Sequence, residues 1–163
     1  MSADNRQQQK TYYSNYGSGV IDVTAPGGDW YVRGPQRTPA SGLILSTWPA
    51  TLREDLPSQL ITQDCQGTVC ATYSYLQCTS MAAPHVTGVV ALMISQYGSM
   101  SPGAVKAQLT QTAEPLDCSA RTYNPVPQLL QYGLDFTATC LDGMGHNGFY
   151  GVGEVDALSA ITK

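Results

Sequence analysis

The chain has 163 residues, of which 42% are hydrophobic, and its formal net charge is −4, from 12 acidic and 8 basic side chains. This length is enough for one domain with a sizeable core. No uninterrupted run of apolar residues is long enough to span a membrane, and no basic run would neutralise phosphates. We therefore expect neither a membrane nor a nucleic acid as a partner. The first ten residues are polar, and nothing in them indicates a signal peptide.

In chain order, residues 1–18 are polar and turn-rich, which predicts an irregular segment. Residues 20–25 (VIDVTA) predict a short buried strand that ends at the Pro-Gly-Gly sequence of residues 26–28. Residues 43–47 (LILST) predict another strand in the core. The first third of the chain is thus expected to supply short strands joined by loops.

Residues 48–72 show no helical or strand period, and we interpret them as a surface insertion. Cys65 and Cys70 are close enough in sequence to close a short loop within it. Residues 73–76 alternate in polarity and predict an edge strand that leads into the next segment.

The segment from Gln77 to Ile94 contains the candidate catalytic residue. A polar turn ends in Ser80, and a long apolar run with many small residues follows, which predicts a buried helix. Ser80 would lie at or next to its N-terminus, where free backbone N–H groups and the helix dipole favour negative charge. A hydroxyl that attacks a carbonyl produces an oxyanion that needs such donors. Ser80 is therefore a candidate nucleophile, although a serine at this position is more commonly only a helix cap.

Beyond this helix, Ser101 and Pro102 predict a second helix start, with serine as the cap and proline at the first helical position. That helix is expected to run to about residue 113. Residues 115–148, rich in proline and glycine, predict a loop closed by a disulfide. Residues 151–161 predict a short closing helix.

Five cysteines in a chain with few charges are typical of a secreted protein. The candidate pairs are Cys65 with Cys70 and Cys118 with Cys140, which would leave Cys78 over; the sequence does not fix the connectivity. A zinc site is the other use of such residues. It is disfavoured because no paired Cys-x-x-Cys and no two histidines on one helical face are present.

The string from Thr79 to Val86 (TSMAAPHV), followed by Gly88, closely resembles the serine motif of the subtilisin-like serine proteases, the subtilases. Cys78 departs from that motif, because the family usually has glycine there. Further segments resemble the family in the same order along the chain: residues 13–17, 22–28, 44–47 and 151–160.

This resemblance implies an α/β, subtilisin-like fold, with a largely parallel sheet flanked by helices. Residues 1–163 would be the C-terminal portion of one catalytic domain. The implied activity is that of a secreted serine endopeptidase, which cleaves proteins or peptides through an acyl-enzyme on Ser80. The backbone N–H of Ser80 would be one oxyanion donor.

The family's catalytic Asp and His, and its oxyanion-hole Asn, would all precede Met1. The expected partner is therefore an N-terminal fragment of the same protease that carries them. No cofactor is required for this chemistry. A structural calcium ion is implied by the family alone, since no residue pattern here identifies its ligands.

The remaining candidates have simpler interpretations. His85 matches the motif histidine, which is structural in the family, and His146 is expected to be exposed in a loop. Asp22, Asp29 and Asp156 lie at predicted strand or helix ends, where capping and turn roles are ordinary.

Cys78 could itself be a nucleophile, but no positive neighbour in the sequence would lower its pKa. If the family's glycine needs a backbone angle that excludes a Cβ atom, Cys78 would be strained and would disturb Ser80. Two other functions stay open. One is a non-catalytic binding or structural module derived from a subtilase. The other is a sedolisin-like acid peptidase, although His85 directly after Pro84 fits the subtilases better.

Overall fold

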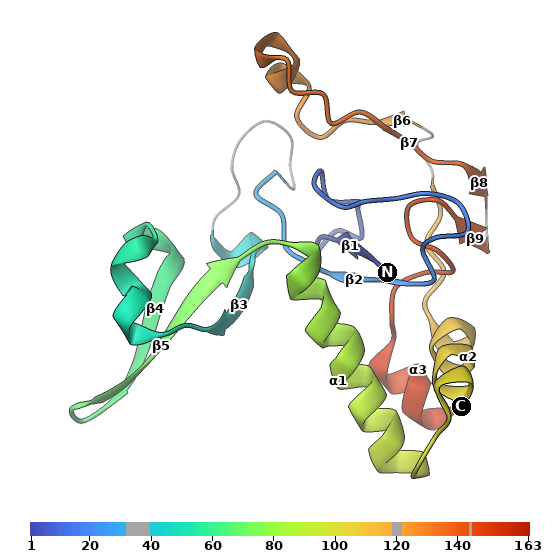
Figure 1. The fold of residues 1–163 in the computed structure, drawn as a ribbon, viewed down its shortest axis with the longest axis horizontal. Coiled ribbons are helices and arrows are strands. Elements are labelled where there is room, and N and C mark those ends of the chain that lie inside the picture. Colours follow the sequence, from blue (N-terminus) through green and yellow to red (C-terminus); the bar gives the residue numbers. More distant parts are fainter. Residues whose placement is uncertain (32–39, 119–121, 144) are drawn as a thin grey trace.

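The computed structural model describes residues 1–31, 40–118, 122–143 and 145–163. Figure 1 shows a central pair of short strands, with helices below it and an extended antiparallel sheet projecting to one side. The helices are α1 (Thr79–Tyr97), α2 (Pro102–Thr112) and α3 (Ala157–Thr162). No helix within the described ranges is long and apolar enough to cross a membrane.

The central strands β1 (Ser2–Asp4) and β2 (Thr24–Pro26) pair in parallel, with Ser2 opposite Thr24. The far edge of β2 is also paired, because Thr24 N donates to Gly153 O at 2.9 Å and Val155 N donates to Thr24 O at 3.0 Å. All of β1 is buried, so the prediction that residues 1–18 are irregular is wrong at this strand. The strand is too short to show an apolar alternation in the sequence.

The projecting sheet consists of β3 (Ile44–Thr47), β4 (Ile61–Gln66) and β5 (Val69–Leu76) in the order β3-β5-β4, with both pairs antiparallel. The insertion predicted at residues 48–72 therefore contains strands. Residues 73–76 belong to the central strand of this sheet and are not an edge. β3 is half-exposed to exposed and does not lie in the core.

Helix α1 begins where the sequence predicts, but it is not the buried helix that was expected. Only Ala82, Val89 and Met93 are buried along its 19 residues. Met93 and Val89 pack with Leu109 of α2 and Ala160 of α3 into one core cluster. The described part of the chain covers only this face of α1: Val86 and Val90 are half-buried beside the cluster, whereas Leu92, Ile94 and Tyr97 are exposed.

Helices α2 and α3 have the expected caps. Ser101 Oγ accepts a hydrogen bond from Ala104 N at 3.2 Å, and Pro102 is the first helical residue, as predicted. Asp156 caps α3 by accepting from Ser159 N at 2.9 Å. The closing helix begins at Ala157, later than predicted, because the preceding segment pairs with β2 in extended form.

The segment predicted as loop at residues 115–148 does contain short regular elements: β6 (Thr122–Tyr123), β7 (Ala138–Thr139), β8 (Asp142–Gly143), β9 (His146–Asn147) and the 3-10 helix η4 (Pro127–Tyr132). Further 3-10 helices are η1 (Ala40–Gly42), η2 (Ala50–Asp55) and η3 (Ser58–Leu60). Both candidate disulfides, Cys65–Cys70 and Cys118–Cys140, are present, and Cys78 is free.

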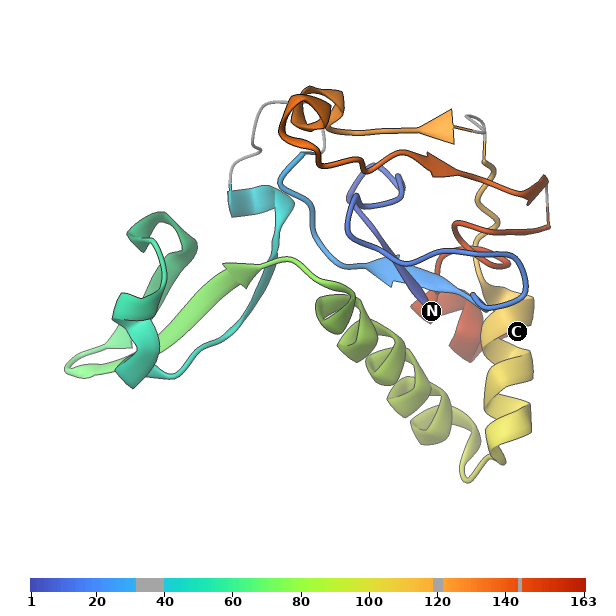
Figure 2. The same ribbon diagram turned by 45° about the horizontal axis from the view of Figure 1, so that its top comes forward.

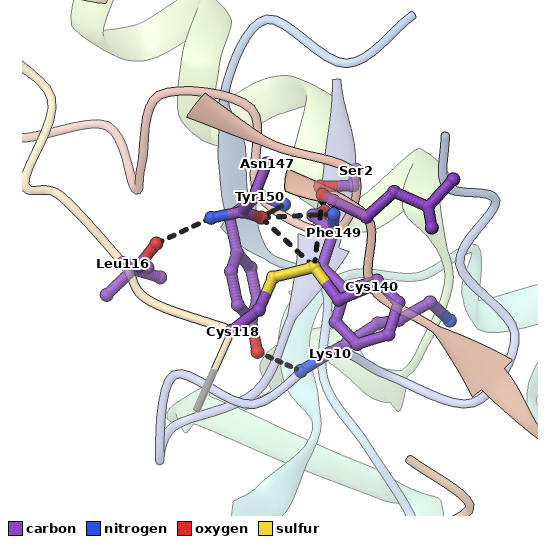
Figure 3. The surroundings of a disulfide bond; sticks show 9 residues. Ser2, Lys10, Leu116, Cys118, Cys140, Asn147, Phe149 and Tyr150 are labelled. Atoms are coloured by element: carbon purple, nitrogen blue, oxygen red, sulfur yellow. Dashed lines mark hydrogen bonds between the residues drawn. A yellow bond between two sulfur atoms is a disulfide. The ribbon is translucent and has the colours of Figure 1, made fainter. Parts of the chain in front are cut away.

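The Cys118–Cys140 disulfide lies beside a buried polar centre at Asn147 (Figure 3). Asn147 Oδ1 accepts from Phe149 N and Tyr150 N at 3.1 and 2.9 Å, while its Nδ2 donates to Leu116 O at 2.7 Å. These bonds fasten the 115–148 segment to the strands, because Ser2 Oγ in turn donates to Phe149 O at 2.7 Å.

Candidate active site

Ser80 is the second residue of α1 and is exposed to solvent. The prediction that it lies at or next to a helix N-terminus is confirmed. Backbone N–H groups in the first turn of a helix have no partner within the helix. The exposed hydroxyl therefore lies where such donors and the positive end of the helix dipole are available to a negative group.

The turn at Gly27 and Gly28 packs against the turn that leads into Ser80. Cys78 N donates to Gly27 O at 3.0 Å. A Cβ atom on Gly27 would lie 2.9 Å from Cys78 O and 2.7 Å from Ala3 Cβ, so only glycine permits this approach. Gly28 has φ +79°, and a Cβ atom there would lie 3.1 Å from Leu76 O. Gly27 and Gly28, which follow β2, thus pack directly against the residues that precede Ser80.

Gln77, three residues before Ser80, anchors the turn from its other side. Its Oε1 accepts from Trp30 N at 2.8 Å, and its Nε2 donates to the hydroxyl of Tyr12. The ring of Tyr12 makes edge-to-face contacts with Tyr31 and Phe136, at centroid distances of 5.3 and 5.1 Å. No sequence pattern reveals this cluster, because its members are far apart in the chain and follow no period.

Cys78 is not strained. Its φ of 177° and ψ of 163° describe extended backbone that any residue adopts, so the hypothesis of a glycine-only angle is wrong. Instead, Ser80 Oγ donates to Cys78 Sγ at 3.4 Å. This hydrogen bond, helped by the backbone N–H groups of Ser80 and Thr79, holds the pKa of the Cys78 thiol below its ordinary value. The cause is local hydrogen bonding and not a positively charged neighbour.

Neither histidine is placed to act as a base for Ser80. His85 Nδ1 lies 2.9 Å from Met81 O, to which it donates, and His146 is exposed on β9. Within the described residues the hydroxyl of Ser80 hydrogen-bonds to Cys78 alone. A general base would have to come from outside this part of the chain.

The three aspartates have structural partners. Asp22 pairs with Lys106 at 2.8 Å, and Asp156 is the cap of α3. Asp29 is buried and accepts from Tyr31 N at 2.8 Å, and burial raises the pKa of its carboxyl group. None of these contacts orients an imidazole ring.

No three His, Cys, Asp or Glu side chains in the described ranges converge on a point where a metal ion could bind. The described residues therefore identify no side-chain ligand set for zinc. The calcium ion that the resemblance implies stays a prediction, since backbone carbonyl groups are also among the ligands of calcium.

Comparison with known proteins identifies relatives along nearly the whole chain. A profile of the subtilase family matches residues 1–153. Thermitase of Thermoactinomyces vulgaris is 32% identical over 70% of this chain and 28% of its own length. Bacillopeptidase F of Bacillus subtilis (strain 168) is 28% identical over 93% of this chain and 8% of its own length.

Among solved structures, a protease from Pseudoalteromonas arctica PAMC 21717 superposes with a TM-score of 0.58 and 29% identity. The match covers 98% of this chain and 34% of that one. It confirms the predicted α/β fold class. The chain spans about a third or less of the length of each of these relatives.

Proposed function

The chain belongs to the subtilase family, and on this basis we propose that residues 1–163 are the C-terminal, serine-bearing portion of the catalytic domain of a secreted serine endopeptidase. The observation that carries the proposal is the position of Ser80, exposed in the first turn of α1. The match to the subtilase family favours this function over the sedolisin-like acid peptidase.

In the proposed reaction, Ser80 Oγ attacks the carbonyl carbon of the scissile peptide bond. The proton of the hydroxyl passes to a histidine of the upstream segment, which then protonates the leaving amine. The backbone N–H of Ser80 donates to the oxyanion that forms during the attack. Water then hydrolyses the acyl-enzyme on Ser80 and regenerates the hydroxyl.

The proposed partner is an N-terminal segment of the same protease, which would supply the Asp and His of the triad. Two observations support it. Among the described residues no histidine hydrogen-bonds to Ser80. In addition, α1 exposes Leu92, Ile94 and Tyr97 to 47%, 45% and 44%, which is unusual for a central apolar helix. The two disulfides support an oxidising, extracellular location.

Labelling with a fluorophosphonate probe, which reacts with activated serines, tests the proposal. We expect Ser80 to be labelled when the upstream segment is present and not in this chain alone, and the Ser80→Ala variant to stay unlabelled in both states. Labelling of this chain alone would contradict the requirement for an external base.

The second candidate is a non-catalytic subtilase-derived module. The hydrogen bond between Ser80 and Cys78 favours it, because a hydroxyl held by a neighbouring sulfur is less free to attack. An unlabelled Ser80 in the presence of the upstream segment would make this module the better interpretation.

A further inference from the structure

The start of α1 depends on contacts from outside the helix. Cys78 occupies its cap position, and sulfur is a weaker acceptor than the side-chain oxygen atoms that cap α2 and α3. Figure 2 shows the short connection from β5 to α1, beside the chain that follows β2. There Cys78 N donates to Gly27 O at 3.0 Å. Gln77, the residue before the cap, fastens the same connection through its side chain.

Gln77 is half-buried and uses both ends of its amide group. Its Oε1 accepts from Trp30 N at 2.8 Å, and its Nε2 donates to the hydroxyl of Tyr12. These partners precede Gln77 by 47 and 65 residues, so one side chain joins three separate segments. A hydrogen bond at each end of a planar amide fixes both the position and the orientation of the group.

The hydroxyl of Tyr12 is itself held in place by the packing of its ring. The ring makes edge-to-face contacts with Tyr13, Tyr31 and Phe136, at centroid distances of 5.3, 5.3 and 5.1 Å. Aromatic pairs in this arrangement stabilise one orientation of a ring. A phenylalanine at position 12 would therefore keep the ring and remove the hydroxyl that meets Gln77.

We propose that Gln77 is a positioning residue for Ser80: its two hydrogen bonds hold the turn where the hydroxyl and the N–H of Ser80 meet the scissile carbonyl group. This inference rests on the proposed function. Ser80 is exposed and three residues from Gln77, so a shift of Gln77 reaches it directly through the turn. A reacting group misplaced by about 1 Å can lose about a hundredfold in rate. The side chain of Gln77 therefore acts on the reaction through the position of the nucleophile.

The test measures kcat and KM on a tetrapeptide anilide, in the protease with its upstream segment, for Gln77→Leu, Tyr12→Phe and the two changes together. Gln77→Leu removes both hydrogen bonds of the side chain, and Tyr12→Phe removes one. The matched control is Gln63→Leu on the exposed hairpin, because Gln63 also hydrogen-bonds at both ends of its amide, to Arg53 and Thr72. Near-UV circular dichroism checks that each variant is folded.

We expect Gln77→Leu to lower kcat about tenfold and Tyr12→Phe about threefold, with KM changed by less than about twofold. In the Gln77→Leu background, Tyr12→Phe should have no further effect, because both changes break the same contact. Gln63→Leu should leave kcat and KM unchanged. An unchanged kcat in Gln77→Leu would overturn the proposal, and so would additive losses in the double variant. If Gln77→Leu does not fold, an unchanged kcat in Tyr12→Phe overturns it.

Failure of the proposed function is distinguishable from failure of this inference. If the fluorophosphonate probe does not label Ser80 of the unaltered protease, the endopeptidase assignment fails. The thiol of Cys78 still reports on the turn, because the hydrogen bond from Ser80 lowers its pKa. We expect Gln77→Leu to move the alkylation of Cys78 by iodoacetamide, followed by mass spectrometry, to higher pH. An unchanged alkylation profile would show that Gln77 does not hold the turn.

Discussion

The sulfur of Cys78 is the immediate neighbour of the candidate nucleophile and competes with the proposed reaction in two ways. It accepts the hydrogen bond of the Ser80 hydroxyl, which together with the backbone N–H groups of Ser80 and Thr79 lowers the pKa of its thiol. The Ser80 N–H is also the proposed oxyanion donor. A thiolate at Cys78 would therefore engage the same donor and repel the developing negative charge.

Replacement of this thiol should reveal the competition as a pH effect. In the protease with its upstream segment, we expect Cys78→Gly to raise kcat/KM about threefold or more, with the largest gain at alkaline pH. The reason is that the thiol ionises as the pH rises through its lowered pKa. The measurement is kcat/KM on a tetrapeptide as a function of pH. Superimposable profiles for Cys78 and Cys78→Gly would contradict this electrostatic role.

Gly153, like Gly27, is a position at which the surrounding atoms permit only glycine. Its φ is +145°, and a Cβ atom would collide with the carbonyl group of Glu114. That carbonyl belongs to a paired bridge, because Glu114 N donates to Glu154 O at 2.8 Å and Glu154 N donates to Glu114 O at 2.9 Å. We expect Gly153→Ala to lower the free energy of unfolding by roughly 2 kcal/mol or more.

The matched control is Gly103→Ala in α2. A Cβ atom there would meet nothing within 4 Å, so this variant should stabilise the protein by roughly 0.5–1 kcal/mol. Urea unfolding of both variants in the same background provides the comparison. An equal change in the free energy of unfolding in the two variants would show that the collision at Gly153 is relieved without cost.

At the scale of elements, the two disulfides should differ in their effect on stability. Cys118 and Cys140 are 22 residues apart, whereas Cys65 and Cys70 are 5 apart and join paired strands beside the turn of a hairpin. Because the entropy of the unfolded chain falls more when a longer loop is closed, we expect serine at both positions to cost about 3 kcal/mol for the first pair and about 2 kcal/mol for the second.

Denaturant unfolding of the two double variants measures these costs. A larger loss for the Cys65–Cys70 pair than for the Cys118–Cys140 pair would contradict the loop-length account. It would show instead that the hairpin contributes to the stability of the body.

Across the whole molecule, the buried carboxyl group of Asp4 should make stability depend on pH. Burial, followed by the charge of Glu154, raises the pKa of Asp4 to about 8. In the unfolded chain the pKa of an aspartate is about 3.9, so between about pH 4 and pH 8 the folded state binds the proton and the unfolded state does not. The free energy of unfolding should therefore fall as the pH rises through this range.

The neighbouring buried cation acts above that range. Burial lowers the pKa of Lys10 to about 8, so Lys10 is protonated in both states below pH 8. Above pH 8 the folded state releases the proton of Lys10 while the unfolded state keeps it, so the free energy of unfolding rises with pH there. Asp4→Asn should flatten the fall between pH 4 and pH 8, and Asp64→Asn on the exposed hairpin should leave it unchanged. An unaltered slope in Asp4→Asn would rule out this carboxyl group as the source.

The sequence predicts those parts of the molecule that local chemistry decides. Ser101 and Pro102 mark the start of α2, and the small apolar run after Ser80 marks α1, because caps and helix periods act over a few residues. Strand β4 and the first half of β5 are not predicted, because β4 is half-exposed to exposed and so has no buried face to impose an apolar alternation. Their pairing depends on the turn at Gly67, with φ 63°, instead.

In the candidate site, too, the sequence predicts the features that local residues decide and not those that distant contacts decide. Ser80 could be identified from its position before an apolar run and from the family motif. The contact between Gln77 and Tyr12 could not, because it joins residues 65 apart in the chain through side chains alone. The exposure of α1 also escaped prediction, since a sequence shows that a helix is apolar but not how much of its surface the chain itself covers.

The hairpin β4–β5 projects from the body, and the residues at its tip are exposed to solvent (Figure 1). Every peptide bond between Cys65 and Cys70 lies inside the covalent ring that their disulfide closes. Autolytic cleavage at Gly67 would therefore open the ring but release no fragment, because the disulfide still joins the two segments. Autolysis at this tip would yield a nicked species that migrates as one chain until it is reduced.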